Sequence, residues 1–173
     1  TKRSKLQKTS VNGYVANNEL YSKLNIKDMD GKDKYQLGAK VAQENGGVKA
    51  FLSDSLMLNY NKWAVDKSNY IKYDSTGIIV HNFTINNSGQ SLSINSKSEN
   101  VKAPIDVILK DFHIKTLTNL AEQDSLQLDG VINGNVLVKN VMTAPVVTSN
   151  ITIDTLTYNR DTVGNILVKV VNE

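Results

Sequence analysis

The stretch between Leu126 and Val138 alternates apolar and polar residues over an unusual length. It reads L-Q-L-D-G-V-I-N-G-N-V-L-V, with aliphatic residues or glycine at every second position and mainly polar residues between them. Successive side chains of a β-strand point to opposite faces, so this pattern predicts one strand with an apolar face and a polar face. At about 3.3 Å per residue the strand would extend about 40 Å, well beyond the usual length of about five or six residues. A strand this long indicates an extended sheet with one continuous apolar face.

The rest of the chain repeats this alternation between turn signals. Tyr35–Val41 and Val48–Leu52 flank Asn45-Gly46-Gly47, and the run from Ile79 to Ile85 is followed by a turn at Asn87-Ser88-Gly89 and a return through Leu92. Asparagine and glycine adopt the left-handed conformations of tight hairpin turns, so both segments are predicted to be hairpins. The sequence therefore predicts an all-β fold.

Further signals refine this prediction. Asn12-Gly13 and the stretch from Asp161 to Gly164 are expected to be turns. The alternation changes phase before Phe112, which predicts a β-bulge or a bend. The segment Thr116–Gln123 spaces its leucines by three, which predicts one or two helical turns with Thr116 as a capping residue. We expect at most this one short helix.

Composition excludes several function classes. The formal net charge is +3 and the basic residues are not clustered in the body of the chain, so nothing indicates nucleic-acid binding. There is no cysteine and no apolar run near the length of a membrane span. The chain begins with Thr and ends in a strand pattern. We therefore interpret residues 1–173 as a single β-rich segment of a longer protein, with residues 1–10 as a frayed terminus.

No residue pattern indicates catalysis. The two histidines, His81 and His113, have no cysteine or carboxylate partners at metal-ligand spacing, and the known catalytic and phosphate-binding motifs are absent. The sequence predicts no metal site, no cofactor and no enzymatic activity. Trp63 is interpreted as a core or capping residue rather than as an interaction anchor.

Two stretches of the chain resemble a known family. One runs from Leu56-Met57-Leu58-Asn59-Tyr60-Asn61-Lys62-Trp63 through Ile78–Phe83 to Gly89–Ile94, and the other runs from Leu109–Ile114 to Leu126–Asn135. Together they resemble the TamB family, the translocation and assembly module subunit among the AsmA-like bridge proteins, in the form found in Bacteroidetes. The resemblance covers most of the chain from Leu56 onward and is carried by strand patterns rather than by catalytic signatures.

The resemblance implies a fold, a location and partners. It implies an elongated, curled antiparallel sheet, a half-pipe or "β-taco" with an apolar concave face. It implies a periplasmic protein that is anchored to the inner membrane and reaches the outer membrane. The implied partners are phospholipid acyl chains and, through the whole protein, an outer-membrane barrel of the Omp85 type similar to TamA. The implied functions are phospholipid conduction between the two membranes and support of outer-membrane assembly.

The alternating pattern then selects the residues expected to line the lipid groove. They are the apolar residues on one parity of the predicted strands, namely Ile79, Phe83, Ile85, Leu92, Ile94, Leu126, Leu128, Ile132, Val136, Val138, Ile151, Ile153, Ile166, Val168 and Val170.

The same alternation is compatible with other functions. The open edges of a sheet can accept a client strand, which would make the chain an assembly scaffold. Alternatively, two apolar faces could pack on each other in a β-sandwich module of an adhesin or surface protein that transports no lipid. A single curled layer would favour the conduit, and facing layers would favour the sandwich.

Overall fold

The computed structural model describes residues 8–120 and 127–171. Within these ranges the chain forms one antiparallel sheet of 14 strands and one short helix. The elements in chain order are β1 (Lys8–Ala16), β2 (Glu19–Lys27), β3 (Asp33–Glu44), β4 (Gly47–Leu52), β5 (Leu56–Leu58), β6 (Asn61–Val65), β7 (Tyr70–Asp74), β8 (Gly77–His81), β9 (Phe83–Asn87), β10 (Gln90–Ser96), β11 (Ile105–His113), α1 (Ile114–Leu120), β12 (Leu128–Lys139), β13 (Val146–Tyr158) and β14 (Asp161–Val170).

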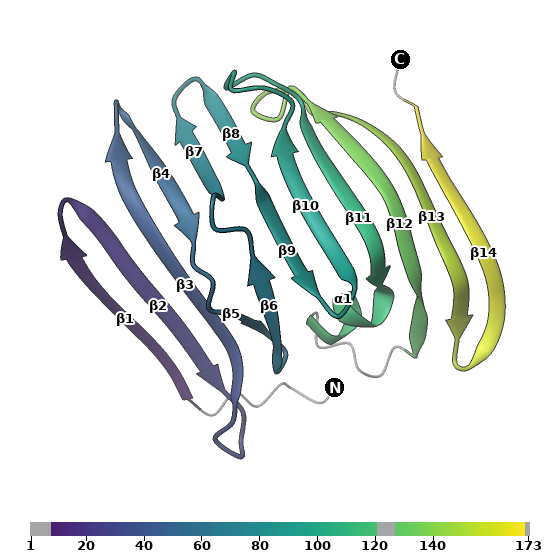
Figure 1. Cartoon of the computed structure of the whole chain (residues 1–173). Helices are drawn as coiled ribbons and strands as arrows, with labels where there is room; N and C mark the ends of the chain where they lie inside the picture. The colour runs from purple at the N-terminus through teal and green to yellow at the C-terminus, as the bar shows by residue number, and fades with distance from the viewer. Residues whose placement is uncertain (1–7, 121–126, 172–173) are drawn as a thin grey trace.

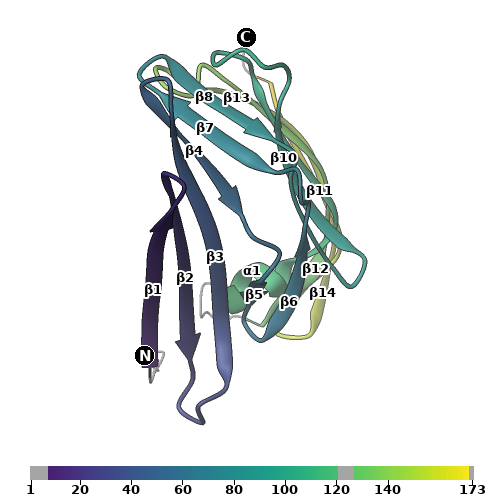
Figure 2. The ribbon, with the colours of Figure 1, turned by 60° about the vertical axis from the view of Figure 1, so that its left-hand side comes forward.

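The strands follow one another across a curled sheet that does not close into a barrel. The hydrogen-bonded order is β14-β13-β12-β11-β10-β9-β6-β5-β3-β4-β7-β8, and β2 and then β1 extend the sheet beyond β3 (Figure 1). Figure 2 shows two arms, a first arm of β1–β4 with β7 and β8 and a second arm of β10–β14, with α1 between them near one end. The prediction of an all-β, curled antiparallel sheet is therefore confirmed.

Helix α1 identifies the concave surface, which we call the inner face. Its last residue, Leu120, lines a groove together with Leu24 and Leu37 from the first arm. Its first residue, Ile114, lies beside Gly130 and Ile153 of the second arm, since a Cβ built at Gly130 would be 3.3 Å from Ile114 Cδ1 and from Ile153 Cγ2. The helix therefore lies over the same face of the sheet in both arms.

Asparagine-rich pairs in the left-handed conformation close most of the hairpins. Asn17-Asn18, Asn45-Gly46, Asn59-Tyr60, Ser88-Gly89 and Asn159-Arg160 all have positive φ at both residues, as type I′ turns require. The two hairpins predicted at Asn45-Gly46-Gly47 and Asn87-Ser88-Gly89 are confirmed.

Two predicted turns are wrong. Asn12-Gly13 lies within β1, where Asn12 pairs with Lys23, and Asp161–Gly164 lies within β14. Glycine is tolerated inside a strand when the flanking residues stay paired. The actual turns are the neighbouring pairs Asn17-Asn18 and Asn159-Arg160, because asparagine also reaches positive φ at low cost.

Three non-glycine residues with positive φ interrupt the strands, and each uses an asparagine from another strand. The backbone N–H groups of Asn82, Asp111 and Thr155 donate to the side-chain oxygens of Asn95 (2.6 Å), Asn133 (2.7 Å) and Asn165 (2.9 Å). The register shifts beside Asp111 and Thr155 mark β-bulges. A bulged residue loses its place in the ladder, so these asparagines satisfy donors that would otherwise lack a protein partner. The bulge predicted before Phe112 is confirmed.

Helix α1 begins earlier than predicted. It covers Ile114–Leu120, while residues 121–123 of the predicted helix lie outside the described residues. Thr116 does not cap it, because Thr116 lies inside the helix and its hydroxyl donates to Gln90 Oε1 at 3.0 Å. Burial of Ile114, which is only 6% exposed, favours the earlier start.

The core lies at the centre of the inner face. Its buried residues are Leu56, Trp63, Val65, Ile85 and Phe112. The rings of Trp63 and Phe112 are tilted against each other with centroids 5.9 Å apart, a geometry that adds to the effect of apolar burial. Trp63 is therefore a core residue, as its sequence context predicted.

The opposite, outer face of the first arm carries a ladder of rings and lysines. Tyr14 stacks on Tyr21, the Nζ of Lys40 lies 4.4 Å from the ring centroid of Phe51, and Tyr70 stacks on His81. Cross-strand ring pairs and cation–π contacts stabilise neighbouring strands. They provide contacts on a face that the core does not reach.

Candidate functional site: the apolar inner face

The predicted lining residues of β9 to β14 come together in rows that cross the strands. Residues directly opposite in an antiparallel pair share a face, so the register shows the rows directly. One row contains Phe83, Ile94, Val107, Val136, Ser149 and Val170, a second contains Ile85, Leu92, Leu109, Gly134, Ile151 and Val168, and a third contains Phe112, Ile132, Ile153 and Ile166.

Two further predicted residues follow the same alternation along β12. Val138 pairs with Ile105 on one side and Val147 on the other, which continues the inner face toward the end of the strand. Leu128 lies at the start of β12 and pairs with Tyr158. Leu126 lies outside the described residues.

The structure corrects the placement of Ile79. Ile79 pairs with Lys72, whereas its neighbour Val80 pairs with Ile71 and belongs to the inner face of the first arm. Ile79 therefore lies on the outer face of the sheet. The simple alternation fails here because Asn82, with φ 46°, shifts the phase between β8 and β9. Phe83 and Ile85 are consequently on the inner face, although Ile79 is not.

The inner face of the first arm is a second apolar surface, which lies outside the residues predicted to line the groove. Val11 and Val15 are each 72% exposed. An adjoining groove of about 390 Å³ is lined mainly by Leu24, Ile26, Tyr35, Leu37, Met57, Leu58 and Leu120. The signal was present in the sequence, since Leu20, Leu24 and Ile26 alternate, as do Tyr35 and Leu37.

The inner face is therefore open on both flanks and filled at its centre. The core around Trp63 and Phe112, together with α1, occupies the central part. On the outermost strand of the second arm, Val168 and Val170 remain 39% and 43% exposed. Aliphatic side chains of this kind offer dispersion contacts and hydrophobic burial but no directional bonds, so the surface suits alkyl chains.

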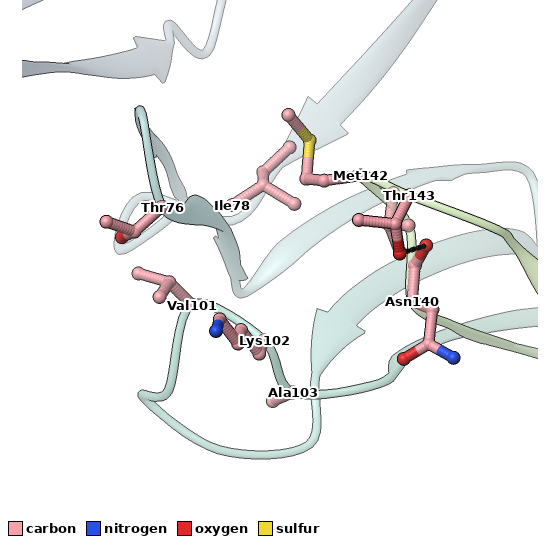
Figure 3. Close-up of a pocket in the computed structure, with 9 residues that line it drawn as sticks. Thr76, Ile78, Val101, Lys102, Ala103, Asn140, Met142 and Thr143 are labelled. Atoms are coloured by element: carbon pink, nitrogen blue, oxygen red, sulfur yellow. Dashed lines mark hydrogen bonds between the residues drawn. The ribbon is translucent and has the colours of Figure 1, made fainter.

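A pocket of about 270 Å³ lies at one end of this surface, where three loops meet (Figure 3). Its lining comes from the β7–β8 turn, the β10–β11 loop and the β12–β13 loop, namely Thr76, Ile78, Val101, Lys102, Ala103, Asn140, Val141, Met142 and Thr143. Figure 3 shows Ile78 and Met142 along one side, with Val101 and Ala103 across from them.

Backbone contacts fix the walls of this pocket, which we call the rim pocket. The N–H of Ile78 donates to the carbonyl of Val101 at 3.1 Å, and the N–H of Ala103 donates to the carbonyl of Asn100 at 2.8 Å. A Cβ built at Gly77 would lie 2.2 Å from the Val101 carbonyl oxygen, so only glycine allows this approach. These backbone contacts hold β8 against the β10–β11 loop at the wall of the rim pocket.

A hydrogen bond joins the first arm to the central strands. The hydroxyl of Tyr60, in the β5–β6 turn, donates to Asp28 Oδ2 at 2.6 Å in the β2–β3 loop. This bond raises the pKa of Tyr60 to about 12 and lowers the pKa of Asp28. The contact is partly exposed to water and therefore connects the two regions only weakly.

The described residues contain no group of three or more His, Cys, Asp or Glu side chains that could hold a metal ion. None of their helical segments has the length and apolar character needed to cross a bilayer. In the described sheet, β1, β8 and β14 each pair on one side only. Val163 and Leu167 on β14 are 57% and 65% exposed, so this edge presents both free backbone groups and apolar side chains.

Comparison with known proteins adds no identification. No protein-family model, curated protein or solved structure matches the chain. The geometry of the inner face is therefore the basis for the functional argument.

Proposed function

We propose that the inner face binds the acyl chains of phospholipids, as one segment of a cell-envelope bridge protein similar to the TamB family. The observation that carries this proposal is the set of rows across β9 to β14, which are apolar apart from Ser149 and Gly134 and of which two end in half-exposed valines at β14. Each methylene moved from water onto such a surface contributes roughly 0.8 kcal/mol. A chain of methylenes would therefore bind without any specific polar contact.

The openness of the sheet supports the same proposal. An apolar surface on a protein needs a partner or a ligand when it extends over several strands. Here the strands belong to one hydrogen-bonded sheet, and the first arm adds a further groove lined by Leu24, Leu37 and Leu120. In the proposed bridge protein, the periplasmic location, the inner-membrane anchor and the TamA-like barrel partner belong to the full-length chain.

A photo-crosslinking experiment tests contact with lipid. A crosslinking residue at Ile153, in the third inner row, is expected to give lipid adducts in cells. The same residue at Lys139, which is exposed at the end of β12, is the matched control and is expected to give few. Equal labelling at both positions would contradict the proposal.

A charge in the second arm tests the function itself. Val136→Arg places an ion among Val107, Ser149 and the neighbouring apolar rows, where an unpaired charge is costly to desolvate. The variant is expected to stay folded and to lose lipid transport, whereas Asn135→Arg, at an exposed position of the same strand, is expected to retain it. Circular dichroism of both variants provides the folding control.

The alternative function is a β-sandwich module of a surface or adhesin protein. The observation that favours it is the filled centre, where Trp63 and Phe112 pack between parts of the sheet. If Val136→Arg unfolds the chain and no lipid adduct forms at Ile153, the sandwich function is the better account.

The open β14 edge is compatible with a role in assembly through strand addition.

A further inference from the structure

We propose that the rim pocket binds the negatively charged headgroup of a phospholipid whose acyl chains lie on the inner face, and that Lys102 makes the site selective for anionic over zwitterionic lipids. This proposal rests on the proposed function and adds the class of lipid to it.

The charge of the rim pocket is the first argument. Among its described lining residues, Lys102 is the single charged side chain, and the other polar groups are the hydroxyls of Thr76 and Thr143 and the amide of Asn140. No carboxylate lines it to neutralise the ammonium group. Lysine acts as a point charge for phosphate, and hydroxyls and amides can donate further hydrogen bonds to its oxygens.

The apolar walls of the rim pocket are the second argument. Ile78, Val101, Ala103, Val141 and Met142 make up the remaining lining. A free phosphate ion would gain nothing from these side chains, whereas the glycerol backbone and first methylenes of a lipid would be removed from water by them. The combination of one cation with apolar walls therefore fits an anionic amphiphile.

The position of the rim pocket is the third argument. Ile78 pairs with Tyr73 on the inner side of β8. Ala103 and Asn140 stand two residues outside the paired inner-face residues Ile105 and Val138. The rim pocket therefore adjoins the end of the inner face formed by β11 and β12. A lipid with its headgroup here would have its acyl chains directed onto those rows.

The charge on Lys102 predicts the selectivity. A phosphatidylglycerol headgroup carries one net negative charge, whereas phosphatidylcholine carries a compensating trimethylammonium group that Lys102 would repel. Both lipids offer a phosphate to Lys102, so the expected difference of about tenfold in affinity comes from the choline cation, which offsets the attraction in phosphatidylcholine alone.

Binding of short-chain lipid monomers to the 173-residue chain tests the proposal. Dihexanoyl-phosphatidylglycerol and dihexanoyl-phosphatidylcholine are titrated below their micelle concentrations by isothermal calorimetry. The expected result is about tenfold tighter binding of the glycerol lipid. Lys102→Glu is expected to abolish or reverse this preference. Lys110→Glu, on the exposed opposite side of β11, changes the net charge equally and is expected to preserve it.

The outcomes separate this proposal from the proposed function. If both lipids bind equally to the wild type and Val136→Arg weakens both, the inner face binds acyl chains but the selective rim pocket is overturned. If the preference disappears in Lys102→Glu while Val136→Arg has no effect, the rim pocket is supported and the acyl-binding inner face fails. If inorganic phosphate alone binds as tightly as the glycerol lipid, the site is an anion site and the lipid proposal is overturned.

Discussion

The centre and the flanks of the inner face use the same aliphatic and aromatic residues but bury them to different extents. Phe112 at the centre is 2% exposed, whereas Leu37 in the first arm and Val168 in the second are both 39% exposed. All three lie on the apolar side of their strands. Alternation thus selects the face of the sheet, while curvature and the position of α1 decide which part of that face is covered.

The largest expected effect is a difference in stability between these regions. Phe112→Ala removes a ring that packs on Trp63 and should cost about 3–5 kcal/mol of unfolding free energy. Leu37→Ala, on the open flank, should cost about 1 kcal/mol or less because its side chain is already partly hydrated. Urea unfolding can be followed through the fluorescence of Trp63, the one tryptophan of the chain. Equal losses would show that the flank is packed as tightly as the centre.

A smaller effect is expected where β8 leads into β9, between the first arm and the centre. Asn95→Ala removes the acceptor for the Asn82 N–H and should cost about 1–2 kcal/mol. Asn86→Ala, at an exposed position of the adjacent β9, is the matched control and should change stability by less than about 0.5 kcal/mol. If the two variants were equally stable, the asparagine would not support the junction.

The smallest effect concerns the bond between Tyr60 and Asp28. The pKa of Tyr60 rises from 10.0 to about 12 in the folded chain, so its contribution to stability is complete below pH 10 and is lost as the pH rises toward 12. The pKa of Asp28 is lowered, so that contribution is present above its unfolded pKa and disappears in acid.

Tyr60→Phe should therefore flatten the alkaline part of the stability profile between pH 10 and 12 without changing the fold. Tyr73→Phe, which alters a similarly exposed tyrosine on β7, serves as the control. Urea midpoints across this pH range provide the measurement. An unchanged alkaline profile in Tyr60→Phe would show that this bond does not couple the first arm to the centre.

Much of the fold could be predicted from the sequence because alternation depends on neighbouring residues alone. The long β12 strand, the hairpin at Asn45-Gly46 and the phase change before Phe112 all follow from local patterns. The exceptions depend on contacts distant in sequence. Ile79 changes face because Asn82 is held in a left-handed conformation by Asn95 on another strand.

The candidate site was predictable only in part, for a related reason. The residues that share the inner face of β9–β14 follow from parity, but exposure depends on what lies opposite. No local pattern indicates that Ile114 would start α1 against Gly130, or that Leu120 would line a groove with Leu24. The rim pocket combines three loops that are far apart in the sequence, so no single motif identifies it.

The asparagine-bonded interruptions at Asn82, Asp111 and Thr155 have a mechanical consequence. An extra residue on one side of a strand pair lengthens that side, and the strand must bend toward the other. The extra residues at Asp111 and Thr155 therefore help to set the curvature of the second arm. A sheet whose curvature is fixed by its own residues would select a ligand by its thickness and would not adjust its shape to it. In the lipid-binding function proposed above, a ligand of a different thickness would have to strain these asparagine hydrogen bonds.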